Sequence, residues 1–105
     1  MTAKSSSLIA VVISFSEGSV QESGWGRFLE LAGTGARLTT RSELKRHETV
    51  FLTFEAAGEK FKGLPALVTH AEIDGEGSVL AEICFTDEVE KRRLSKTLLD
   101  ALSRG

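Results

Sequence analysis

The sequence contains only one cysteine and one proline, and it has no apolar run long enough to cross a membrane as a helix. Because Cys84 has no second cysteine to pair with, an internal disulfide is excluded. A lone cysteine is also typical of a reducing compartment. We therefore expect a cytoplasmic protein without membrane insertion. No basic residue adjoins Cys84 to favour its thiolate, so we expect this thiol to be unreactive.

The sequence also lacks an excess of basic residues. It has 13 lysines and arginines against 15 acidic residues, which gives a net charge of -2. Such a chain supplies no basic field for a phosphate backbone, so nucleic acid is not an expected partner. With 105 residues, 41% of them hydrophobic, and no internal repeat or linker, we expect a single globular domain over 1–105.

Motifs for catalysis, metal binding and nucleotide phosphates are missing as well. His47 and His70 are separated from each other and from Cys84, and no His-Glu-x-x-His or nucleophile-elbow pattern occurs. Gly33 and Gly35 lack the third glycine and the following helix of a dinucleotide-binding loop. We therefore expect no catalytic residues, no metal and no cofactor, and we interpret the two glycines as a turn between strands.

Alternating apolar and polar residues predict β-strands separated by turn signals. The apolar run from Leu8 to Ile13 follows Lys4, but it is too short for a secretory signal and fits a first strand better. Asp74-Gly75 is a strong hairpin signal between the last two strands, and Pro65 indicates a sheet edge or a bulge. The predicted strands occupy 7–15, 27–32, 36–40, 48–56, 61–73 and 78–85.

From Thr86 onward, apolar residues recur at every third or fourth position instead of every second one. This spacing predicts a helix over 87–103 with Thr86 as its N-cap. The apolar face of this helix consists of Leu94, Leu98, Ala101 and Leu102. Oppositely charged pairs four residues apart are expected to stabilise its exposed face. These pairs are Asp87 with Lys91 and Glu88 with Arg92.

This order of strands, glycine turn and C-terminal helix resembles the PilZ domain, a small β-barrel of bacterial signalling proteins. In that family the second strand ends in Asp or Asn, an apolar residue, Ser, two free positions and Gly, which align here with Glu30 to Gly35. The closing strand and helix are matched by "AEICFTDEVEKRRL", from Ala81 to Leu94. The resemblance implies a mainly β fold, a six-stranded antiparallel PilZ-like barrel with a C-terminal α-helix.

The sequence departs from this family at the residues that bind cyclic di-GMP. PilZ domains that bind it carry Arg-x-x-x-Arg ahead of the first strand, whereas "AKSSSL" here offers only Lys4, which lacks the planar guanidinium fork. Glu30 is one methylene longer than the family's Asp, and Ala32 lacks the serine hydroxyl. Only Gly35 keeps the family residue. Cyclic di-GMP is therefore not an expected ligand.

The resemblance implies a non-catalytic adaptor that contacts other bacterial signalling or pilus-machinery proteins, in type IV pilus assembly or motility control. The candidate partner surface includes Trp25, which lies between two glycines in an expected loop, and the helix residues Lys91 and Arg92. Trp25 fits a partner contact or core packing equally well. Phe61 fits the core better.

The alternative function is a cyclic di-GMP receptor with non-standard basic residues. Several cations follow the glycine turn and could form a basic loop near it, although their spacing differs from that of the family. This alternative predicts a ligand site composed of Glu30, Gly35, Arg37, Arg41 and Arg46.

Overall fold

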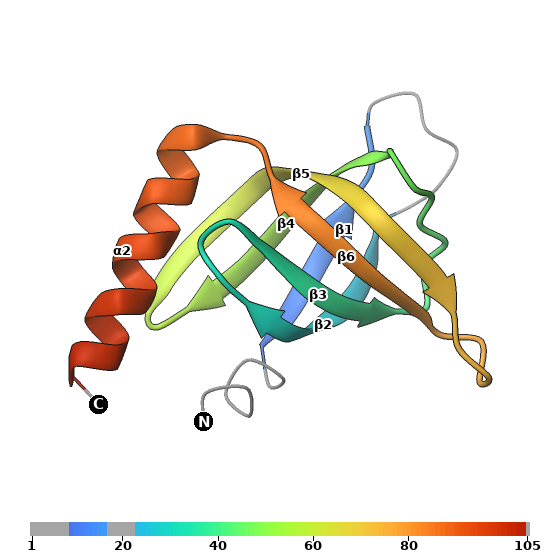
Figure 1. Ribbon diagram of the computed structural model, residues 1–105, viewed down its shortest axis with the longest axis horizontal. Helices are drawn as coiled ribbons and strands as arrows, with labels where there is room; N and C mark the ends of the chain where they lie inside the picture. Colours follow the sequence, from blue (N-terminus) through green and yellow to red (C-terminus); the bar gives the residue numbers. More distant parts are fainter. Residues whose placement is uncertain (1–8, 17–22, 105) are drawn as a thin grey trace.

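The chain forms a closed β-barrel with a helix at its C-terminal end (Figure 1). The computed structural model describes residues 9–16 and 23–104. In these residues the strand order around the barrel is β1-β2-β3-β6-β5-β4, and all neighbouring strands are antiparallel. This confirms the predicted fold class. The elements are β1 (Ala10–Ser14), β2 (Gly24–Leu31), β3 (Gly35–Thr40), β4 (Thr49–Ala56), β5 (Glu59–Ile73), β6 (Val79–Phe85) and α2 (Glu88–Arg104).

The barrel interior is filled by the inward-facing residues of each strand. Three phenylalanines lie at its centre: the rings of Phe28 and Phe54 meet edge to face at 4.9 Å, and Phe54 stacks on Phe61 at 5.2 Å. Phe61 is fully buried, so its predicted place in the core is confirmed. Alternation also gave the correct inward faces of β4 and β6, whose buried members include Val50, Leu52, Phe54, Val79, Ala81, Ile83 and Phe85.

Three strands begin earlier than predicted, β3 by a single residue, at Gly35. β2 starts at Gly24 rather than at residue 27, because Gly24 and Trp25 already pair with Ile13 and Val12 of β1. β5 starts at Glu59 rather than at residue 61, because Ala57 and Gly58 alone connect it to β4. The first predicted strand, 7–15, and the gap between it and the second predicted strand both extend into residues outside the described part of the chain.

The sequence indicated a sheet edge or a bulge at Pro65, whereas Pro65 pairs in register with Phe51 and the bulge lies two residues earlier in β5. The register of β4 against β5 shifts between Leu52 and Phe54, opposite the segment that contains Gly63. Gly63 has a φ of 63°, and its N–H donates to the Thr53 hydroxyl at 2.9 Å. Pro65 lies two residues further along β5, where its carbonyl accepts a hydrogen bond from the Thr86 backbone at 3.1 Å. The bulge thus lies just before Pro65, which has no backbone N–H to donate to a neighbouring strand.

Helix α2 begins one residue later than predicted, and its N-cap is Asp87 rather than Thr86. The Asp87 carboxylate accepts hydrogen bonds from the backbone of Val89 and Glu90 at 3.0 and 3.2 Å. Thr86 is instead held by the Pro65 carbonyl, which accepts from both its backbone and its hydroxyl. The side-chain pairs also differ from the prediction, because they link residues three apart, Glu88 with Lys91 and Glu90 with Arg93.

The helix packs across the barrel end where the β2–β3 turn and the β4–β5 hairpin lie (Figure 1). Leu94 is fully buried in the core, and Leu98 packs against it. The prediction that Leu102 lies on the buried face was wrong, because this side chain is 62% exposed. In the described part of the chain, no helix combines the length and the apolar character needed to span a bilayer.

Candidate functional site

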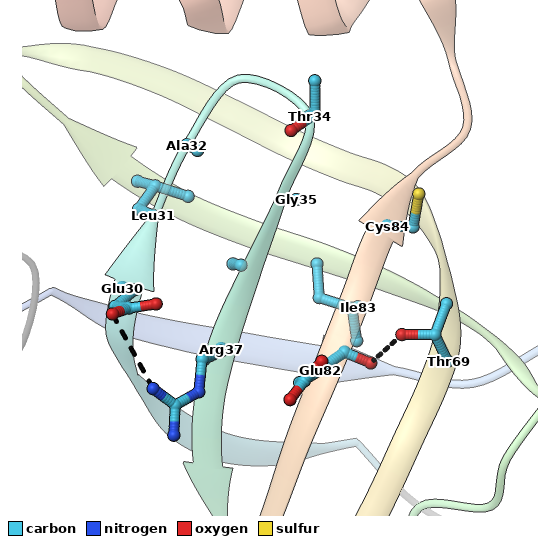
Figure 2. A pocket seen from close by; sticks show the side chains of 11 residues that line it. Glu30, Leu31, Ala32, Thr34, Gly35, Arg37, Thr69, Glu82, Ile83 and Cys84 are labelled. Atoms are coloured by element: carbon cyan, nitrogen blue, oxygen red, sulfur yellow. Dashed lines mark hydrogen bonds and ion pairs between the residues drawn. The ribbon is translucent and has the colours of Figure 1, made fainter.

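A hollow lies on the outer face of the barrel, over β2, β3, β5 and β6, beside the β2–β3 turn (Figure 2). Its volume is about 660 Å³, and it is open to solvent. We call it the turn hollow. The polar side chains that line it are Glu30, Thr34, Arg37, Thr69 and Glu82, with the thiol of Cys84 at one edge.

The charges in the turn hollow are dominated by carboxylates. Glu30 and Arg37 are register partners on β2 and β3, just after a register shift, and their side chains form an ion pair at 3.7 Å (Figure 2). Glu82 projects from β6 into the same hollow and adds a second carboxylate. Two acids against one guanidinium leave the hollow with a net negative charge. The Thr69 hydroxyl is also engaged, since it donates to the Glu82 backbone carbonyl at 3.2 Å.

The two glycines of the turn allow neighbouring groups to pack closely against its backbone. A Cβ at Gly35 would meet the carbonyl oxygen of Ile83 and lie 3.4 Å from the Cα of Cys84. A Cβ at Gly33 would meet the Ser95 side chain and lie 3.1 Å from its Cα. Neither glycine has a positive φ. The Ala32 N–H donates to the Gly35 carbonyl at 2.9 Å, so part of the turn backbone is already engaged.

The structure does not bring the five predicted ligand residues together. Glu30, Gly35 and Arg37 line the turn hollow, but Arg41 follows the opposite end of β3. At about 3.3 Å per strand residue, Arg41 lies roughly 13 Å along the chain from Arg37. Arg46 is further away still in sequence, in the connection between β3 and β4. Lys4, in the segment where the family's arginine motif would stand, lies outside the described residues.

Trp25 lies in a second hollow at the other end of β3, which we call the tryptophan hollow. Its volume is about 410 Å³. Trp25 belongs to strand β2 and not to a loop, and its side chain is 70% exposed, so it is a surface residue rather than a core residue. Two guanidiniums and one carboxylate line the same hollow, those of Arg27, Arg41 and Glu76. Sequence reasoning missed Arg27, because only the pairing of β2 with β3 brings it near Arg41.

The predicted partner surface is therefore divided between two ends of the barrel. Lys91 and Arg92 lie on α2 beside Gly33 and Thr34, at the turn end. The Lys91 ammonium pairs with Glu88 at 3.1 Å, and the Arg92 side chain is exposed. Trp25 lies at the opposite end, near the β5–β6 turn. The two parts of the predicted surface therefore do not form one continuous site.

Residues with potential for metal binding or catalysis are dispersed. Among the described residues, no group of three histidine, cysteine, aspartate or glutamate side chains is close enough to hold a metal ion. Cys84 is exposed on the outward row of β6. His70 is also exposed, and its Nε2 lies 3.7 Å from the Glu72 carboxylate.

A scan against protein-family models gave no match, and a search of curated protein sequences gave none either. The resemblance to PilZ domains therefore still depends on the aligned turn from Glu30 to Gly35 and on the order of the elements. The fold itself is established independently of it, as a closed six-stranded antiparallel barrel with one C-terminal helix in the described residues.

Proposed function

We propose that this protein is a non-catalytic, PilZ-like adaptor that acts through protein–protein contacts in bacterial signalling, type IV pilus or motility control. The observation that carries the proposal is the excess of carboxylates over guanidinium groups in the turn hollow. It occupies the place where the PilZ ligand motif would lie, yet its one guanidinium is paired with Glu30 and a second carboxylate faces it.

This arrangement disfavours cyclic di-GMP, which carries two phosphate charges. Arginine binds phosphate through bidentate hydrogen bonds, and Arg37 would have to leave Glu30 to make them. Glu82 would then face the ligand as an uncompensated acid. Each charge-assisted hydrogen bond that is absent forfeits about 1.5 to 3 kcal/mol, and Ala32 also lacks the hydroxyl of the family motif.

The alternative, a cyclic di-GMP receptor with non-standard basic residues, has less support. It requires Arg37, Arg41 and Arg46 to act on one ligand, whereas the first two lie in different hollows. An adaptor requires instead a surface side chain suited to a protein partner, and the exposed indole of Trp25 is such a side chain.

Calorimetric titration with cyclic di-GMP tests the proposal. We expect no saturable binding with a dissociation constant below roughly 100 μM, which corresponds to about -5.5 kcal/mol. The matched variant is Arg37→Ala, which removes the one guanidinium of the turn hollow and should give the same flat titration. Tight binding by the unmodified protein that Arg37→Ala abolishes would overturn the adaptor proposal in favour of a receptor.

A further inference from the structure

We infer that the tryptophan hollow is a docking surface for an acidic peptide segment of a partner protein, with Trp25 as its apolar anchor. This inference extends the proposed adaptor function, since it names the surface and the chemistry of the partner. It differs from the resemblance, which places the family's ligand at the opposite end of β3.

The first argument is the way Trp25 is held. Its carbonyl accepts a hydrogen bond of 2.7 Å from the hydroxyl of Thr40, a residue that is only 4% exposed. The adjacent Gly26 is packed so closely that a Cβ there would lie 2.7 Å from the carbonyl oxygen of Thr39. The backbone that carries the exposed ring is therefore held in place. A backbone that is already ordered loses little conformational freedom when a partner covers the side chain.

The second argument is the free energy available from covering the indole. Tryptophan is the largest apolar side chain, and 70% of Trp25 is exposed to solvent. Covering such a ring removes a large apolar surface from water, which should contribute at least the tenfold in affinity that the Trp25→Ala variant is expected to lose. Val12 is the register partner of Trp25 on β1 and is partly exposed, which extends the apolar surface beside the ring.

The third argument is charge. Arg27 and Arg41 line the hollow with Trp25, and neither guanidinium forms an ion pair with another described residue. Glu76 is the one acidic residue of the lining, so the hollow has a net positive charge in a chain whose net charge is -2. A partner with carboxylates complements this pattern. Two guanidiniums offer fork-shaped donors that bind carboxylates in a bidentate manner.

These features favour a peptide over a nucleic acid. A nucleic-acid surface needs a row of cations that follows the phosphate backbone, and this chain has no such excess of basic residues. Tryptophan and arginine together are instead the residues most enriched at the energetic centres of protein interfaces. The partner segment should therefore contain acidic residues beside one or more apolar side chains.

Selection from a display library of random peptides on the immobilised full chain provides the first test. The selected peptides should be enriched in aspartate and glutamate beside an apolar residue. One of them, labelled with fluorescein, is then titrated with protein and followed by anisotropy. The double variant Arg27→Gln with Arg41→Gln should weaken binding at least tenfold, and so should Trp25→Ala. Lys62→Gln with Lys96→Gln removes the same charge at exposed residues outside this hollow and should leave binding within twofold.

Trp25 also serves as its own probe, because it is the only tryptophan of the chain. Peptide binding should shift its emission to shorter wavelengths and protect it from acrylamide. A library that yields no acidic peptide, equal binding by the double variant, or an unshifted emission would overturn the inference, and none of these outcomes affects the calorimetric test of the adaptor. Protection of Trp25 by cyclic di-GMP would overturn it too, in favour of a nucleotide site.

Discussion

The guanidinium of Arg93 lies over the ring of Phe61, with 4.1 Å between its central carbon and the ring centroid. The same group donates to the Lys60 carbonyl and to the Glu90 carboxylate, each at 2.9 Å. Phe61 belongs to the barrel core, so this one side chain joins α2 to the β4–β5 hairpin and covers the aromatic cluster. The helix is therefore attached by a cation as well as by leucines.

Replacing Arg93 with alanine should lower the free energy of unfolding by about 1 to 2 kcal/mol, because it removes the cation–π contact together with the hydrogen bonds to the hairpin. Arg93→Lys keeps the charge but loses the planar group, so its cost should be intermediate. Urea unfolding followed by circular dichroism measures both. Arg92→Ala, one position earlier on the exposed face, is the matched control and should change little. Equal losses of stability in Arg93→Ala and Arg92→Ala would contradict the role of Arg93 in attaching the helix to the hairpin.

The leucines of α2 should differ in their contributions according to burial. Leu94→Ala opens a cavity at a fully buried site and should cost about 2 to 5 kcal/mol. Leu98 is only partly buried, so Leu98→Ala should cost less, and Leu102→Ala should stay within about 0.5 kcal/mol. Urea midpoints of the three variants give this order. If the Leu102 variant were as unstable as the Leu94 variant, the helix face that carries Leu102 would also have to pack against the barrel.

Gly35→Ala should destabilise the barrel by about 1 to 3 kcal/mol, because the added methyl group has to displace the β6 backbone at Ile83. The matched control is Gly75→Ala, where a Cβ meets no atom within 4 Å and the glycine has no positive φ. Thermal unfolding of both variants compares them directly. If both unfold at the same temperature, close packing is not the reason for glycine at this position.

Ala57→Asn should stabilise the protein by about 0.5 to 1 kcal/mol. Ala57 and Gly58 form the two-residue connection of the β4–β5 hairpin with φ values of 51° and 82°. Alanine is strained at positive φ, whereas asparagine tolerates it and is preferred in such hairpins. The urea midpoint should therefore rise in Ala57→Asn and fall in Ala57→Val, whose branched side chain tolerates this conformation least. A lower midpoint for the asparagine variant would rule out strain at this turn.

The parts of the fold that were predictable have strong local signals. Alternation fixed the inward faces of β4 and β6, and Asp74-Gly75 identified the β5–β6 hairpin, where the Asp74 carboxylate accepts hydrogen bonds from Glu76 and Ser78 at 2.8 and 3.0 Å. The break between the predicted strands 48–56 and 61–73 contains the observed β4–β5 connection, but the positive φ of Ala57 was not predicted, because alanine carries no preference for this conformation. Tertiary pairing imposes that turn.

The candidate sites were less predictable, because they depend on which strands become neighbours. The sequence shows that Glu30 and Arg37 flank the same turn. Their direct pairing across β2 and β3 depends on the register shift between Phe28 and Glu30, which the sequence does not reveal. Gly24-Trp25-Gly26 has the composition of a loop, and only pairing with β1 makes it a strand. No pattern in the sequence therefore indicated that Trp25 and Arg41 line the same hollow.

Closure of the barrel has a further consequence for how a partner can be recognised. Each of the six strands has a neighbour on both sides, so their main-chain N–H and C=O groups are largely used within the barrel. Along the stretches where the described strands pair on both sides, a partner therefore finds no unpaired edge to extend by adding a strand of its own. Recognition over these stretches would come from side chains on the outer face, where one substitution can alter binding without disturbing the sheet. Partner choice can thus diverge between related barrels while their architecture stays constant.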